Sequence, residues 1–114
     1  MIFIIDDDRI MAECIARSCK GGTRIFSNAI DAMNAIDDEL PELIFLDILL
    51  DGPDGFTFLE ELNSYSDTVK IPIVVVTSLN IKPQTLINYG VRRILDKTTM
   101  TPDDIRKEVL NVQK

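Results

Sequence analysis

Short runs of apolar residues alternate along this chain with longer segments in which apolar residues recur every three or four positions. The runs are typical of β-strands, and the recurrent spacing is typical of amphipathic helices. The runs 43–46 and 73–76 are apolar throughout, which indicates central parallel strands that helices cover on both faces. The pattern predicts strands at 2–5, 23–26, 43–46, 73–76 and 91–95.

Residues typical of helix ends delimit the first two helical segments. Asp8 can cap the first, which we expect to end at Gly21-Gly22, and Ser27 can cap the second, which ends before Pro41. The apolar positions that we assign to these helices are Ile10, Met11, Cys14 and Ile15 in the first, and Ile30, Met33 and Ile36, facing inward, in the second.

Three further helices are expected. Asp54 can cap the third, and the fourth, around 83–89, is short and weakly patterned. The last opens with a cap, a proline at the first helical position and acids in the first turn, at 101–104. The expected apolar stripes are Phe56, Leu59 and Leu62 in the third helix, and Ile105, Val109 and Val112 in the last.

Strand and helix therefore alternate five times, without an internal repeat or a linker. This alternation predicts one domain, 1–114, of the α/β class: a doubly wound five-stranded parallel sheet in a flavodoxin-like three-layer sandwich. In a sheet of order 2-1-3-4-5 the first and third strands are neighbours at the switch point. Residues at the carboxyl ends of these strands then share the edge where such folds bind ligands.

Polar residues whose side chains can bind ligands or take part in a reaction follow four of the apolar runs. An acidic triplet, 6–8, follows the first run, and Asp47 and Thr77 follow the third and fourth, while Lys97 lies just beyond the fifth. Carboxylates clustered without compensation are unfavourable, so a cation is expected among them. Acids, a hydroxyl and a lysine at one edge of a sheet predict a site for a divalent metal and a phosphoryl group. Asp8 is interpreted as a helix cap, with a part in the metal site as the alternative.

Composition narrows the class of protein further. The net charge of −7 over 114 residues argues against direct binding to nucleic acid, which requires lysine and arginine. The apolar runs are too short for a signal-peptide core or a membrane span, so we expect a cytoplasmic protein without a membrane partner. Cys14 and Cys19 fit two reduced thiols, and the absence of histidine excludes histidine-based triads and most zinc sites.

Four segments in order, IIDDD, PELIFLDILLDGPDG, IPIVVVTS and the lysine of ILDK, resemble the receiver domain of two-component response regulators. The resemblance extends over essentially the whole chain. It implies that Mg²⁺ is bound and that a phosphoryl group is accepted. The implied metal ligands are Asp6, Asp7, Asp47 and the backbone carbonyl of Leu49; Asp47 is also the phosphoacceptor, Thr77 the switch hydroxyl and Lys97 the partner of the phosphoryl oxygens.

The implied chemistry is physically reasonable. Two unit charges ~4 Å apart repel by about 4 kcal/mol at an effective dielectric near 20, and a hard cation plus an ammonium group remove that obstacle to phosphorylating a carboxylate. Without a histidine of its own, the chain needs a phosphohistidine on another protein, a sensor histidine kinase or a histidine phosphotransfer protein. We therefore expect that the chain is not an enzyme but receives the phosphoryl group from that protein. We expect a monomer or weak dimer, which signals to an unknown downstream protein through a changed protein–protein interaction.

The chain departs from the usual receiver pattern in several places. Asp51 and Thr98 stand where prolines are usual, and Ile94 stands where the family has the Tyr or Phe that turns inward on activation. Without that ring, we expect output through the short fourth helix or through a partner's preference for one state. Leu49 and Leu79 flank the mouth of the expected site and cannot orient a water, so we expect slow loss of the phosphoryl group.

Two other functions remain open from the sequence. A pseudo-receiver would keep the fold and bind partners without phosphorylation. A phosphohydrolase of the haloacid-dehalogenase type would use Asp6 and Asp8, which have its Asp-x-Asp spacing, but Ile10 stands where its threonine belongs and Asp47 would have no role.

Arg92 and Arg93 fall where receivers usually present their output face. They are interpreted either as contacts to a partner or as ordinary surface residues.

Overall fold

Five parallel strands form one sheet in the order β2-β1-β3-β4-β5, which confirms the predicted topology. The computed structural model describes residues 1–48, 55–78 and 81–112. The strands differ from the prediction only at two carboxyl ends, where β4 and β5 each extend one residue further. Their bounds are β1 Ile2–Ile5, β2 Thr23–Phe26, β3 Leu43–Leu46, β4 Ile73–Thr77 and β5 Val91–Asp96.

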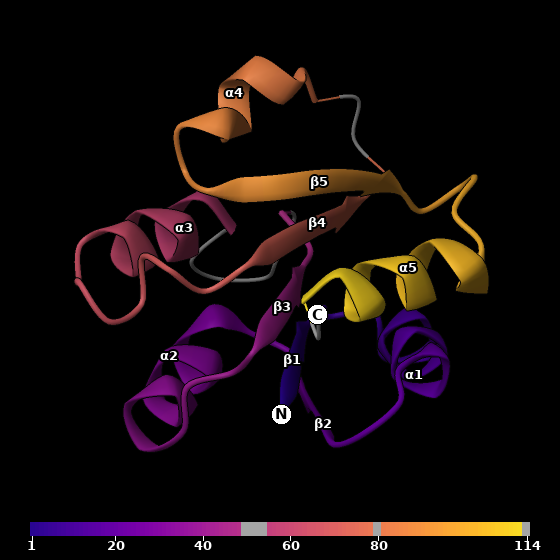
Figure 1. The fold of residues 1–114 in the computed structure, drawn as a ribbon, viewed down its shortest axis with the longest axis horizontal. Coiled ribbons are helices and arrows are strands. Elements are labelled where there is room, and N and C mark those ends of the chain that lie inside the picture. The colour runs from indigo at the N-terminus through magenta and orange to yellow at the C-terminus, as the bar shows by residue number, and fades with distance from the viewer. Residues whose placement is uncertain (49–54, 79–80, 113–114) are drawn as a thin grey trace.

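Helices cover both faces of the sheet (Figure 1). Two of them, α1 and α5, lie together on one face, and α2 and α3 cover the other, while α4 packs beside β5. The bounds of the helices are α1 Arg9–Ser18, α2 Ala29–Asp38, α3 Gly55–Asn63, α4 Pro83–Ile87 and α5 Pro102–Val112. None of them is long and apolar enough, within the described ranges, to cross a membrane.

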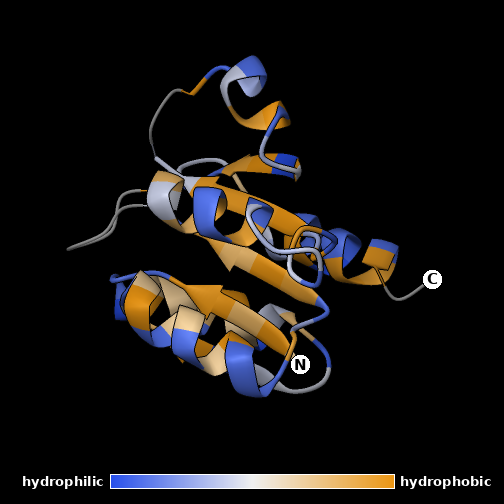
Figure 2. Cartoon of the chain, turned by 90° about the vertical axis from the view of Figure 1, so that its left-hand side faces the viewer, coloured by the Kyte–Doolittle hydropathy of each residue, from blue (hydrophilic) through white to orange (hydrophobic). Residues whose placement is uncertain are grey.

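The sheet separates two hydrophobic cores, and Figure 2 shows that its strands consist largely of hydrophobic residues. Along β1, Phe3 and Ile5 face the core beneath α2, α3 and α4, whereas Ile2 and Ile4 face the core beneath α1 and α5. All four side chains are completely buried. Burial on both faces explains why these strands are apolar runs and not alternating ones.

Helix α1 begins where predicted but ends earlier. The carboxylate of Asp8 accepts a hydrogen bond from the backbone N–H of Met11, so Asp8 is the expected cap. The helix ends at Ser18, and the predicted end at Gly21-Gly22 is wrong, although Gly21 does adopt a positive φ of 101° in the following turn. The assigned apolar stripe is only partly buried: Ile15 is in the core, but Cys14 and Ile10 are exposed, Ile10 by 76%.

Helix α2 is rotated relative to the prediction. Its cap is Asn28 and not Ser27, because the Asn28 carboxamide accepts a hydrogen bond from the N–H of Asp31. Ile30, expected to face inward, is 56% exposed. The buried face consists mainly of alanines, whose small side chains allow α2 to lie close to the sheet: Ala29, Ala32, Ala35 and Ile36.

The other helices largely follow the prediction. In α3, Leu59 and Leu62 are buried as expected, but Phe58 and not Phe56 is the fully buried aromatic residue. The expected cap Asp54 lies outside the described residues. Helix α4 is short, as predicted, and α5 is closed at its start by reciprocal hydrogen bonds between Thr101 and Asp104.

An internal ion pair joins β5 to α5. The Glu108 side chain is only 4% exposed, and its two oxygens lie 3.6 Å from Arg92 Nε and 3.9 Å from Arg93 Nη1. Both arginines thus neutralise a buried acid of their own chain, which is a structural role that the sequence pattern did not reveal.

Candidate functional site

The residues that follow β1 and β3 are held by backbone hydrogen bonds that continue the parallel ladders. The N–H of Asp6 donates to the carbonyl of Phe26 at 2.9 Å, and the N–H of Asp47 donates to the carbonyl of Ile5 at the same distance. Ile5 is also level with Leu46 in the sheet. Asp6 and Asp47 therefore leave neighbouring strands at the same height, as the predicted strand order requires.

Three carboxylates meet at this edge. One oxygen each of Asp6, Asp7 and Asp47 lie within 4.8 Å of one another, with Asp6 and Asp47 buried and Asp7 exposed. Asp8 does not belong to the group, since its carboxylate caps α1 while its own N–H donates to Asp6 Oδ1 at 2.9 Å. The interpretation of Asp8 as a helix cap is thus supported.

Lys97 lies between two of these carboxylates. Its Nζ is 2.9 Å from Asp6 Oδ2 and 3.0 Å from Asp47 Oδ2, and it donates a hydrogen bond to Asp47. Burial disfavours the ammonium, but the close contacts with both aspartates and their negative charges outweigh it and raise the pKa of Lys97. The lysine therefore stays charged and joins the two strand ends electrostatically.

Asp6 is the least satisfied member of the group. Its buried Oδ2 has an ion-pair contact with Lys97 but no hydrogen bond within the described part of the chain. Burial raises the pKa of Asp6 more than Lys97 and the N–H of Asp8 lower it. A buried carboxylate oxygen without a hydrogen bond, beside two further carboxylates, is a donor set that suits a hard divalent cation.

Thr77 lies where it was predicted, at the carboxyl end of β4, and is 1% exposed. Its carbonyl accepts a hydrogen bond of 3.0 Å from the N–H of Lys97, so the hydroxyl-bearing residue and the lysine are joined through the backbone. The backbone carbonyl of Leu49, the side chain of Leu79 and Asp51 lie outside the described residues.

The loop after Lys97 is held without the usual proline. The N–H and hydroxyl of Thr98 both donate to Asp96 Oδ1, at 2.8 and 2.7 Å. These two hydrogen bonds lower the pKa of Asp96. The turn that follows β5 is therefore closed by a side chain, and Lys97 points into the site.

Gly55, at the start of α3, lies against the segment that carries Asp47. Its N–H donates to the carbonyl of Ile48, next to Asp47 in the chain, at 2.9 Å. A Cβ at this position would come within 2.6 Å of Ile48 Cα and 3.0 Å of the Asp47 carbonyl oxygen. Only glycine allows α3 to begin so close to the segment that carries the central aspartate. The signal in the sequence was a glycine at the start of the third predicted helix.

Comparisons with known proteins agree with this fold. The sequence model of the response regulator receiver domain matches residues 2–110. Among curated proteins, the regulator RpaA of Synechocystis is 32% identical over 81 residues, which are 68% of this chain and 34% of RpaA. The response regulator PleD of Caulobacter vibrioides is 29% identical over 82 residues, 69% of this chain and 18% of PleD.

The structural comparison covers nearly the whole chain. The receiver domain of NtrX from Brucella abortus superposes with a TM-score of 0.87 at 26% identity, over 98% of this chain and 97% of that domain. The chain spans at most about a third of the length of the two curated relatives, so it corresponds to one part of each. Because the family match and the superposition both extend over almost all of its residues, the chain belongs to the response regulator receiver domain family of two-component signalling.

Proposed function

We propose that this receiver domain accepts a phosphoryl group on Asp47 from a phosphohistidine of a partner protein. The observation that carries the proposal is the contact of Lys97 with both Asp6 and Asp47, within 3.0 Å, at the edge where the strands end. A lysine so placed can move from the carboxylates to an incoming phosphoryl oxygen over a short distance. The proposed role is a signalling one, with a single phosphoryl group retained and not turned over.

We further propose that Asp6, Asp7 and Asp47 hold Mg²⁺ during the transfer. The buried Asp6 Oδ2, which lacks a hydrogen bond in the described chain, supports this assignment. A bound divalent ion supplies positive charge against the phosphoryl oxygens, which lowers the repulsion between the two reacting anions. The Leu49 carbonyl stays a predicted further ligand.

The groups of the chain have distinct tasks in the proposed transfer. A carboxylate oxygen of Asp47 attacks the phosphorus, a P–O bond forms, the P–N bond to the partner's imidazole breaks, and the imidazole nitrogen takes up a proton. Lys97 then pairs with a phosphoryl oxygen, and the Thr77 hydroxyl donates to another. Because the Lys97 N–H is bonded to the Thr77 carbonyl, a movement at the end of β4 is passed to β5.

For the output, we propose a route through α4. Ile94 is half-buried and packs against the core that contains Leu86 of α4, and it has no ring that could reorient. Ile87, on the same short helix, is 68% exposed. A shift of α4 on Ile94 would change the apolar surface that a downstream protein meets.

Intact mass spectrometry tests the proposal. The chain is incubated with a small acyl-phosphate donor, with and without Mg²⁺, beside an Asp47→Ala variant. One Mg²⁺-dependent adduct that is absent from the variant is expected. Accumulating free phosphate without an adduct would indicate a phosphohydrolase, and neither an adduct nor phosphate, with a cognate kinase also failing, would indicate a pseudo-receiver.

A further inference from the structure

A continuous groove lies on the surface between α2 and α3, the two helices that face the viewer in Figure 2. It consists of a hollow of about 450 Å³ near the carboxyl ends of both helices and a second of about 260 Å³ further along them. Both hollows are lined by Met33, Asn34 and Glu61, which makes them one surface feature. We call it the α2–α3 groove.

We propose that the α2–α3 groove binds a basic, partly apolar segment of a partner protein, whether or not Asp47 is phosphorylated. The groove is distinct from the proposed phosphorylation site. Helices α2 and α3 run against the direction of the parallel strands, so the larger hollow lies at the end of the sheet opposite to the site. Binding there would tether the receiver to a partner independently of its switch.

Part of the lining of the α2–α3 groove is apolar and exposed. Ile30, Leu40 and Tyr65 line the groove and are 56%, 51% and 55% exposed. They are three of the eight large apolar side chains that are exposed in the described part of the chain. Single exposed apolar residues need no explanation, but several gathered in one groove with a polar rim mark an interaction surface.

The rim of the larger hollow carries a concentration of negative charge. Five carboxylates of the described residues line the larger hollow, and no lysine or arginine among those residues does. In the described ranges, only Glu39 has a cation within ion-pair distance, at 4.0 Å from Arg24, so the rim charge is almost uncompensated. The five are Asp37, Asp38, Glu39, Glu61 and Asp67.

Several of these acids lie at the carboxyl ends of α2 and α3, where negative charge is unfavourable for a helix. Asp37 and Asp38 lie in the last turn of α2, Glu39 is its C-cap, and the last turns of α2 and α3 contain no basic residue. The end of a helix carries a partial negative charge, so each such carboxylate costs about 0.3–1 kcal/mol. A cationic partner would offset this unfavourable interaction. Residues that lower the stability of the free fold in this way are expected at binding sites.

Size and charge define the occupant. The ten residues of α2 make the groove about 15 Å long, which accommodates roughly five residues of extended chain. A second copy of this chain is disfavoured, since its net charge is also −7 and the copies repel. The fitting ligand is a segment in which leucine or isoleucine alternates with lysine or arginine.

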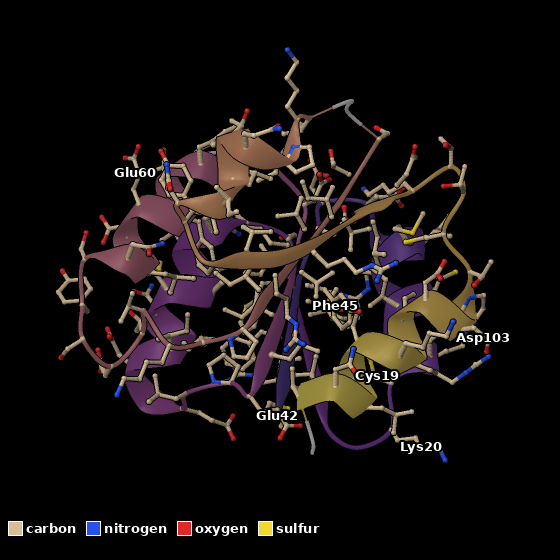
Figure 3. The ribbon with its side chains drawn as sticks, turned by 45° about the horizontal axis from the view of Figure 1, so that its top comes forward. Cys19, Lys20, Glu42, Phe45, Glu60 and Asp103 are labelled. Carbon is tan, nitrogen blue, oxygen red and sulfur yellow. The ribbon has the colours of Figure 1, made fainter. Side chains whose placement is uncertain are left out.

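The test uses a fluorescently labelled peptide of leucine and lysine and measures its binding to the full chain by anisotropy. Two reference peptides replace the lysines by glutamate or the leucines by serine. The rim variant is Asp38→Asn with Glu61→Gln, and the matched control is Glu13→Gln with Asp103→Asn, which removes the same charge from α1 and α5. Figure 3 shows Asp103 on the far side of the molecule from α2 and α3.

We expect the rim variant to bind the leucine–lysine peptide about tenfold more weakly, and the matched control to bind it like the wild type. Leu40→Ser, at an exposed position, should also weaken binding, whereas Asp47→Ala should not. Equal weakening by the control, equal binding of the serine peptide, or no binding by the wild type would overturn the proposal. Because Asp47→Ala retains the groove, these outcomes do not depend on whether the domain is phosphorylated.

Discussion

Replacement of Asp6 by asparagine distinguishes the effect of the buried carboxylate on folding stability from its proposed role in binding Mg²⁺. Burial raises the pKa of Asp6 in the folded chain, so its contribution to stability is fully present below the ordinary value of 3.8 and is lost as the pH rises through the raised pKa. At neutral pH the ionised carboxylate therefore opposes folding. Without Mg²⁺, Asp6→Asn should be more stable than the wild type.

The structure gives the size of the effect. Lys97 Nζ at 2.9 Å attracts Asp6 Oδ2 by about 5.7 kcal/mol at an effective dielectric of 20. Asp47, within 4.8 Å, repels it by at least about 3.5 kcal/mol, and exposed Asp7 by roughly half of that because water screens it. These charge interactions nearly cancel, and the burial of the carboxylate decides the sign. We expect a gain of about 1 kcal/mol, or about 4 °C in Tm.

Mg²⁺ should reverse the order. At ten times its Kd, a ligand that binds only the folded state stabilises it by about 1.4 kcal/mol, and Asp6→Asn lacks one of the proposed metal ligands. Thermal unfolding is measured in EDTA and at increasing Mg²⁺. Asp8→Asn is the matched control, since asparagine caps helices as well as aspartate does. The assignment of the metal site is wrong if Asp6→Asn is less stable than the wild type in EDTA. It is also wrong if Mg²⁺ stabilises Asp6→Asn and the wild type equally.

Three further predictions concern the supports of the site and of α5. Gly55→Ala should destabilise the chain by about 1–3 kcal/mol in urea unfolding and slow phosphorylation, because the new Cβ meets Ile48; a neutral or stabilising result would contradict the close approach. Thr98→Val should raise the pKa of Asp96 toward its ordinary value in an NMR titration, since one of two hydrogen bonds is lost; an unchanged pKa would refute the turn. Asp104→Asn should be less stable than the wild type at neutral pH, and the difference should vanish as the pH falls through the lowered pKa of Asp104; a difference that persists in acid would exclude the charged cap.

The sheet and the site were predictable because both depend on coarse features. A continuous run of apolar residues is sufficient to identify a buried strand. A parallel sheet necessarily places the residues that follow its strands at one edge. Asp6, Asp47, Thr77 and Lys97 needed only the strand order to be placed at that edge. The predicted strand order, 2-1-3-4-5, is one of the topologies of a doubly wound sheet, and the structure has that order.

Most of the predicted details that were wrong depend on contacts between residues far apart in the sequence. Ile30 was placed inward by its spacing from Met33 and Ile36, but α2 packs mainly through alanines that permit a closer approach to the sheet. The choice between Ser27 and Asn28 as a cap shifts the helix start by one residue, and sequence preference for the two is nearly equal. The contact of Gly55 with Ile48 and the burial of Glu108 by two arginines become visible only in three dimensions.

The phosphoacceptor is the central claim, and it is tested most directly by locating the modified residue. The chain is treated with an acyl-phosphate donor and Mg²⁺, the acyl phosphate is reduced with borohydride to homoserine, and the peptides are sequenced by tandem mass spectrometry. We expect homoserine at position 47 alone, only when donor and Mg²⁺ are both present. Homoserine at another aspartate, such as Asp7, or at none would contradict the assignment of Asp47.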